Sequence, residues 1–208
     1  MKKVTLIRHA ESIANAGQAT DSHDMIPLSE KGRLQAQELA ETLTIKPDLI
    51  VISPFSRTHE TAQPFIAKHP NVPVETWDVH EFTYLDPKKF KETKAKERFP
   101  AALLYWTTAS VHHRDGDAES FSDLTNRMAS FIEKLKSRPE NTIVVFTHGR
   151  FIYGLKLYLE KTKKLGRIKL TDRELTHLKN GHTKIINYII AGKMKFPIDN
   201  VSIHEIEI

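Results

Sequence analysis

Three segments of this sequence carry side chains that could bind and transfer a phosphoryl group. Arg8 and His9 follow one apolar run, Arg57 lies shortly after a second, and His148 comes soon after a third. Because a guanidinium stays charged and can hold two oxygens at once, a pair of arginines suits a phosphate dianion. An imidazole with a free ring nitrogen can attack phosphorus and form a covalent intermediate. The pattern therefore indicates phosphoryl transfer, with His9 as the nucleophile.

The apolar runs before these residues are typical of buried strands, which would hold the reactive side chains in place. Strands are predicted over residues 3–7, 49–52, 72–77, 142–146, 183–190 and 201–208. Helices are predicted to begin near Ser29, Ser56, Ser120 and Arg150, with a short one over 171–178. This alternation indicates an α/β fold, a three-layer sandwich with a mostly parallel central sheet of about six strands and helices on both faces. The carboxyl ends of such strands border the ligand crevice, so the arginines and histidines are expected to meet there.

Residues 82–119 interrupt the alternation with two prolines and a run of mixed charge. A long excursion in a compact domain is often functional, so we expect an insertion with some helix that folds over the active-site end as a lid. A surface elaboration with no chemical role is the alternative. The length of 208 residues fits a single domain over 1–208 that contains this insertion.

The charge balance and the lack of cysteine restrict the partners and the compartment. Lys and Arg number 31 against 26 Asp and Glu, a net charge of +5 that fits a basic solvated surface or an anionic substrate. Charges of opposite sign are interleaved and form no basic tract with aromatic spacing, so no nucleic-acid partner is expected. No apolar stretch suits a membrane span or a signal peptide. The lack of cysteine excludes disulfides, thiolate zinc sites and cysteine nucleophiles, and we expect a cytoplasmic protein.

Six motifs follow one another along the chain. They are Arg8-His9-Ala10-Glu11-Ser12 with Asn15, Leu28 to Ala36, Ser53 to Ala62, Glu81 with Tyr84, Gly116 to Ser120 with Arg127, and Thr147-His148-Gly149. Their residues and their order resemble the histidine phosphatase superfamily, in its phosphoglycerate mutase-like branch. Two departures stand out. Ala10 replaces the usual glycine, which places a methyl group beside the expected phosphate site, and Asp117 with Ala118 lengthens the family's Gly-Glu-Ser element.

The resemblance implies a covalent mechanism and a set of site residues. His9 would take the phosphoryl group as a phosphohistidine, which water then hydrolyses. Glu81 would protonate the leaving group as general acid, with Asp78 and Glu119 as rival acids. The residues implied to bind substrate are Arg8, Arg57 and His148 for the phosphate, and Ser12, Asn15, Glu119 and Gly149 beside them. Since the arginines neutralise the phosphate, no metal and no cofactor are expected.

The leading interpretation is a phosphomonoesterase that hydrolyses small phosphorylated metabolites, so the expected partner is a small-molecule phosphate ester. One alternative is a phosphoglycerate mutase, although residues 82–119 do not reproduce the insertion usual in dedicated mutases. An alternative of another class is a non-catalytic module that binds a phospholigand or a protein. The joint presence of all five expected catalytic residues argues against lost activity. The sequence specifies neither the particular substrate nor the oligomeric state.

Overall fold

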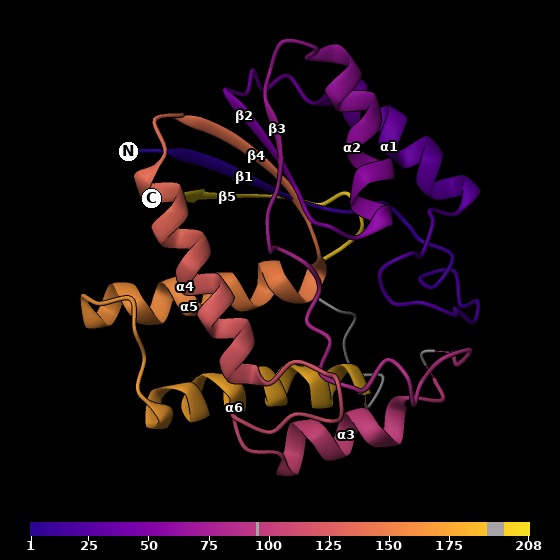
Figure 1. Ribbon diagram of the computed structural model, residues 1–208, viewed down its shortest axis with the longest axis vertical. Coiled ribbons are helices and arrows are strands. Elements are labelled where there is room, and N and C mark those ends of the chain that lie inside the picture. The colour runs from indigo at the N-terminus through magenta and orange to yellow at the C-terminus, as the bar shows by residue number, and fades with distance from the viewer. Residues whose placement is uncertain (95, 191–197) are drawn as a thin grey trace.

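A five-stranded sheet lies at the centre of the molecule (Figure 1). The computed structural model describes residues 1–94, 96–190 and 198–208, with residues 184–190 described by their backbone alone. The strands are β1 (Lys3–Arg8), β2 (Leu49–Ile52), β3 (Val74–Thr76), β4 (Thr142–Thr147) and β5 (Ile203–Glu207), in the order β3-β2-β4-β1-β5. All neighbouring pairs in the sheet are parallel except β1 and β5. The mostly parallel sheet is confirmed, but the described chain forms five strands rather than about six.

The strand predicted over residues 183–190 is wrong, because these residues form the C-terminal part of helix α6 (Asp172–Ile190). The apolar and β-branched composition of the segment favours a strand. The residues just before it, however, are buried at helical spacing, at Leu175, Leu178 and His182. The helix that packs through those residues simply continues. The short helix predicted over 171–178 is therefore the first part of a longer one.

Helices cover both faces of the sheet, as predicted. The helices α1 (Glu30–Thr42) and α2 (Ser56–Lys68) lie on one face, and α4 (Phe121–Ser137) and α5 (Gly149–Leu165) lie on the other (Figure 1). Successive side chains of a strand point to opposite faces. In β1, accordingly, Leu6 packs with the α4 and α5 layer and Ile7 packs with the α1 and α2 layer. The strand is thus buried on both faces, as its unbroken apolar run predicts.

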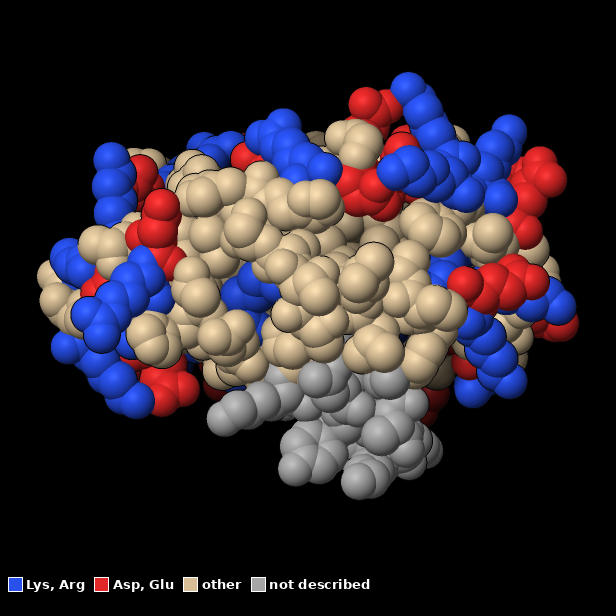
Figure 2. All heavy atoms as spheres, turned by 90° about the horizontal axis from the view of Figure 1, so that it is seen from below, with Lys and Arg blue, Asp and Glu red and all other residues tan. Residues whose placement is uncertain are grey.

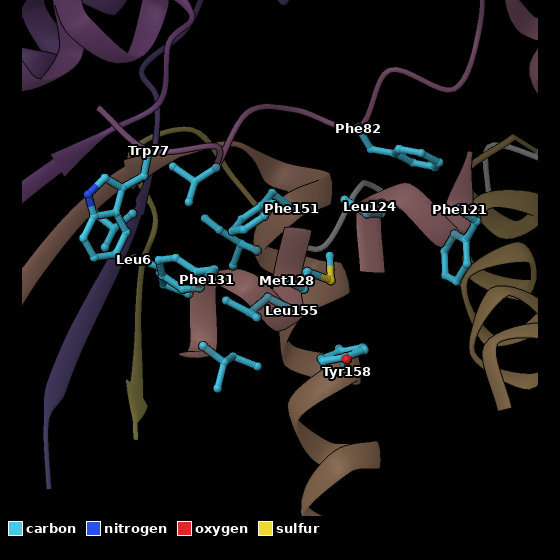
Figure 3. Packing of buried hydrophobic residues seen from close by; sticks show 14 of the residues in the cluster. Leu6, Trp77, Phe82, Phe121, Leu124, Met128, Phe131, Phe151, Leu155 and Tyr158 are labelled. Atoms are coloured by element: carbon cyan, nitrogen blue, oxygen red, sulfur yellow. The ribbon is translucent and has the colours of Figure 1, made fainter. Parts of the chain in front are cut away.

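The larger core lies between the sheet and the α4 and α5 layer (Figure 3). The stretch from Phe121 of α4 onward buries residues at helical spacing, and the side chains of Met128 and Phe131 interleave with those of α5. A capping box fixes the start of α4: the Ser120 side chain accepts a hydrogen bond from the Asp123 amide, and the Asp123 carboxylate accepts one from the Ser120 amide. This box therefore also fixes the position of Glu119, the preceding residue.

The insertion over residues 82–119 contains helix α3 (Phe99–Thr108), which packs against α6 at the lower end of the view in Figure 1. The buried Lys179 of α6 donates hydrogen bonds from Nζ to the carbonyl oxygens of Tyr105 and Trp106, each at 3.2 Å. A cation at a helix C-terminus interacts favourably with the last carbonyls of that helix. The insertion is thus fastened to the α6 layer.

The face formed by α3 and α6 carries charges of both signs (Figure 2). Basic and acidic side chains lie side by side toward the two ends of this face, and uncharged residues occupy its middle. Among the described helices, none combines the length and the apolarity that crossing a bilayer requires.

Candidate active site

The three central strands bring the predicted reactive residues to one edge of the sheet. β4 pairs with β1 on one side and with β2 on the other, and the register aligns Arg8 with Thr147. His9, Ser53 and His148 directly follow the ends of β1, β2 and β4. The ring centroids of His9 and His148 are consequently 5.1 Å apart. Residues from distant parts of the sequence thus share a single crevice, as the strand-end argument predicts.

His9 is held in one tautomer by the backbone. Its Nδ1 lies 2.7 Å from the carbonyl oxygen of Ala10, and because a carbonyl only accepts, Nδ1 must carry the proton. Nε2 is then left with its lone pair and accepts a hydrogen bond from Arg57 Nε at 3.2 Å. Burial, followed by the charges of Arg57 and Arg8, lowers the pKa of His9 well below its ordinary value. The imidazole is therefore neutral at neutral pH, as a nucleophile must be.

Arg57 lies in the first turn of α2, buried beside His9. Besides its bond to His9, it donates from Nη1 to the carbonyl oxygen of His23 at 2.9 Å, and its guanidinium carbon lies 4.9 Å from the ring centroid of Phe55. Burial lowers the pKa of Arg57 to about 10, so the side chain still carries its charge at neutral pH. Arg8 donates from Nη1 to the carbonyl oxygen of Ile198, while its buried Nε has no partner among the described residues.

His148 is fully buried at the N-terminus of α5, and Gly149 is the first residue of that helix. Its Nε2 lies 2.8 Å from Ser53 Oγ, whereas its Nδ1 is buried with no partner in the described part of the chain. Burial, and next the charge of Arg57, lowers the pKa of His148 well below its ordinary value. His148 is thus a neutral side chain that can present Nδ1 to a ligand oxygen.

Glu81 lies in the loop after β3, with 9% of the residue exposed. Its carboxylate accepts hydrogen bonds from the amides of Phe82 at 3.0 Å and Arg150 at 3.1 Å. The second bond connects the loop to the first turn of α5, next to His148. Asp78, a rival acid, is exposed on the surface.

Glu119, the other rival acid and a predicted substrate-binding residue, is engaged elsewhere. Both of its carboxylate oxygens accept hydrogen bonds from Arg127, at 2.6 and 2.9 Å. This pair lines a hollow of about 840 Å³ together with His23, Phe55 and His80. The structure does not bring Glu119 into the cavity that Arg8 and Glu81 line.

Ser12 and Asn15 form a short network beneath His9. Ser12 Oγ donates to Asn15 Oδ1 at 3.1 Å, and the same oxygen accepts from Asn200 Nδ2 at 3.3 Å. Asn200 also donates to the carbonyl oxygen of His9 at 2.9 Å. Asn200 lies far along the chain just before β5, and no motif marked it in the sequence.

Ala10 directs its methyl group away from the expected phosphate site. The residue is fully buried and belongs to a small apolar cluster with Leu28 and Ala36. Its amide donates to Thr61 Oγ1 at 3.0 Å. The departure from the family's glycine therefore fills a core position and leaves the crevice free.

A cavity of about 420 Å³ opens next to these residues, between residues 14–23 and the insertion. Its lining includes Arg8, Asn15, His23, Glu81 and Arg150. The buried residues His9, Arg57 and His148 are not part of this lining. His23 links them to it, because His23 lines the cavity and its carbonyl oxygen accepts a hydrogen bond from Arg57. The volume is in the range of small-molecule sites.

Two residues of this site, Arg150 and His23, were missed in the sequence. Arg150 directly follows His148 and Gly149, so its position in the sequence indicated that it could lie near the site. Whether a side chain in the first turn of a helix reaches the cavity, however, depends on the direction in which that turn faces. His23 comes from a loop without regular structure and offered no such indication. Within the described residues, no group of three or more His, Asp or Glu side chains is arranged to hold a metal ion.

Comparisons with known proteins show the family to which this chain is related. The family model described as the histidine phosphatase superfamily (branch 1) matches residues 4–188. A probable phosphatase of Schizosaccharomyces pombe is 30% identical over 182 residues, which are 84% of this chain and 82% of that protein. A metal-independent phosphoserine phosphatase of Arabidopsis thaliana is 26% identical over 86% of this chain and 77% of its own length. A phosphoserine phosphatase of Entamoeba histolytica, solved with phosphoserine, superposes with a TM-score of 0.65 at 20% identity, covering 99% of this chain and 90% of that one.

Proposed function

The chain belongs to the histidine phosphatase superfamily (branch 1) and is a metal-independent phosphomonoesterase, and we propose that it hydrolyses small phosphorylated metabolites through a phosphohistidine on His9. One observation carries the proposal. With Nδ1 of His9 donating to the Ala10 carbonyl, the lone pair lies on Nε2, where it accepts a hydrogen bond from Arg57 Nε at 3.2 Å that a bound phosphate would take over. A neutral imidazole nitrogen beside a guanidinium is suited to attack a bound phosphate.

We propose that the reaction proceeds in two displacements. His9 Nε2 forms a bond to phosphorus as the bond from phosphorus to the ester oxygen breaks, and Glu81 gives a proton to that oxygen. A water molecule then attacks phosphorus, Glu81 takes up its proton, and the bond to His9 breaks to release inorganic phosphate. The transferring oxygens would be held by Arg57, Arg8 and His148 Nδ1. Arg57 Nη1 would exchange the His23 carbonyl for a phosphate oxygen.

The domain organisation belongs to the same proposal. Residues 1–208 would act as one domain in which residues 82–119 cover the active-site end. Residues of this insertion that line the cavity, among them Phe82, Tyr84 and Ala102, support that arrangement. The cytoplasmic location and the expectation of neither a nucleic-acid partner nor a membrane stay predictions from the sequence.

Substitution of the nucleophile tests the proposal. The wild type is expected to hydrolyse p-nitrophenyl phosphate without added metal, and His9→Ala to lose at least roughly a thousandfold in kcat, as removal of a covalent nucleophile does. Rapid quenching should trap an acid-labile phosphoryl group on the wild type alone. His59→Ala removes an exposed histidine of α2 and serves as the matched control. Equal turnover by the two variants would reject His9 as the nucleophile. A wild type without measurable turnover would favour the non-catalytic module.

The mutase alternative is separated by the products formed from 3-phosphoglycerate. We expect inorganic phosphate and glycerate, because water is then the acceptor of the phosphoryl group. The measurement is phosphate release alongside chromatographic separation of the phosphoglycerates. Formation of 2-phosphoglycerate without phosphate would establish the mutase.

A further inference from the structure

The cavity beside His9 holds more positive charge than one phosphoryl group needs. Its lining includes four cationic side chains against two carboxylates; the cations are Arg8, Lys91, Arg98 and Arg150, and the acids are Asp21 and Glu81. Arg57 adds a further cation directly behind the lining. The phosphoryl group has to lie next to His9, where Arg8 and Arg57 meet it. Arg98 and Arg150 are then left over in the remainder of the cavity.

Arg150 lies at the cavity wall, and N–H groups of its guanidinium are available to a ligand. Its Nη1 lies 3.8 Å from Glu81 Oε2, which is longer than a charge-assisted hydrogen bond. Its buried Nε has no partner among the described residues. The guanidinium carbon lies 5.4 Å from the ring centroid of Tyr84, and a side-chain hydrogen bond with Tyr84 helps to hold the group there, which leaves its other N–H donors for a ligand. The side chain keeps 38% of its surface exposed, so a ligand in the cavity can reach it.

Arg98 enters the cavity from the insertion and is fixed in place by its own loop. It donates from Nε to Thr93 Oγ1 at 3.0 Å and from Nη2 to the Thr93 carbonyl oxygen at 2.7 Å. Burial lowers the pKa of Arg98, and Tyr84 acts in the opposite direction. The charge of Arg150 lowers this pKa further, so the two guanidinium groups interact electrostatically. Like charges in one partly buried cavity repel, and an anion between them removes the repulsion.

We propose that Arg150 determines substrate specificity by binding, together with Arg98, a second anionic group of the phosphate ester. That group is a carboxylate or a second phosphate, both of which match the guanidinium fork. The carbon skeleton between the two anions would lie against Phe82, Tyr84 and Phe90, which also line the cavity. This inference rests on the proposed function, since it takes the phosphoryl end of the substrate to lie at His9.

Paired substrates that differ only in the second anion test the assignment. 3-Phosphoglycerate and glycerol 3-phosphate differ by a carboxylate, and fructose 1,6-bisphosphate and fructose 6-phosphate differ by a phosphate. The wild type is expected to have the higher kcat/KM for the member with two anionic groups in at least one pair. The preference of the enzyme is the kcat/KM of this member divided by that of the other member. Arg150→Gln should lower this preference roughly ten- to a hundredfold, which corresponds to the loss of a hydrogen bond to a charged group, chiefly through KM. The pair that responds identifies the second anion.

Two further variants make the outcome decisive. Arg98→Gln should also lower this preference, and it serves as the test variant if Arg150→Gln does not fold. Arg173→Gln removes an exposed arginine of α6 outside the cavity and should leave the preference between the two substrates unchanged. A wild type with no preference in either pair, or equal losses on both members in the Arg150 and Arg98 variants, overturns the inference. Turnover of p-nitrophenyl phosphate in the same preparations tests the phosphatase activity separately.

Discussion

At the scale of single residues, the nitrogen of His9 that we propose to attack phosphorus is selected by the backbone next to it. The Ala10 carbonyl takes the Nδ1 proton, which leaves Nε2 for the Arg57 side chain. The sequence could predict His9, because a histidine after a buried strand lies at the edge where ligands bind. It could not predict the tautomer, because every residue has a carbonyl and only the folded loop shows which one lies within reach.

Glu81 is the residue whose role is most directly testable. Glu81→Gln keeps the size of the side chain and removes its proton, so esters with poor leaving groups should lose roughly a hundredfold or more in kcat/KM, which reports on the first displacement and not on the later attack of water. p-Nitrophenyl phosphate should lose far less, because its leaving group departs without protonation. Steady-state kinetics on p-nitrophenyl phosphate and glycerol 3-phosphate measure the difference. Glu133→Gln, at an exposed position of α4, is the control, and equal losses on both esters would assign the acid elsewhere.

At the scale of elements, the site depends on how the first turn of α1 meets the loop that follows His9. Ser29 caps α1 and donates from Oγ to Glu11 Oε1 at 2.9 Å, and Gly32 lies against the Glu11 backbone. The strands and this cap were predictable, because apolar runs and a serine N-cap are local signals. The extension of α6 over residues 183–190 was not, since its β-branched composition favours a strand and only packing through His182 selects the helix.

Gly32→Ala is expected to destabilise the protein and displace this loop. A Cβ at position 32 would lie 2.0 Å from the Glu11 carbonyl oxygen, a backbone atom that cannot turn aside. Overpacking of this kind costs about 1–3 kcal/mol in the free energy of unfolding. Urea unfolding measures the loss, and phosphatase activity should fall with it because the Glu11 loop continues directly from His9.

The same substitution elsewhere in the chain should have the opposite effect. Gly181 lies on α6 and is exposed, and a Cβ at this position would meet no atom of the described residues within 4 Å. Gly181→Ala should therefore raise the free energy of unfolding by about 0.5–1 kcal/mol, the difference in helix propensity. A stable and fully active Gly32→Ala protein would show that the α1 contact does not position the loop.

At the scale of the whole molecule, the fold buries several histidines in the neutral state. Burial lowers the pKa of His23, His80 and His182 to about 3 in each case, and it lowers those of His9 and His148 well below their ordinary value. Between that folded value and the unfolded value near 6.5, the unfolded chain binds protons that the native state does not. Stability is therefore fully present above about pH 6.5 and is lost as the pH falls toward 3.

His182 isolates this effect from catalysis, because it is 4% exposed and stacks on Trp106 with centroids 5.9 Å apart, in the α3 and α6 layer. A pKa shifted from 6.5 to about 3 removes about 2 kcal/mol of stability between neutral pH and pH 5. Urea unfolding at pH 7 and pH 5 should thus show a pH-dependent loss that is about 2 kcal/mol smaller in His182→Gln than in the wild type. Any cost of the substitution itself appears at both pH values and cancels in this difference. His177→Gln removes an exposed histidine of the same helix and should retain the wild-type loss. If the wild type and His182→Gln lose the same free energy, His182 binds its proton equally well in the folded and the unfolded chain, and the acid sensitivity between pH 7 and pH 5 has to come from other groups, such as the buried histidines around His9.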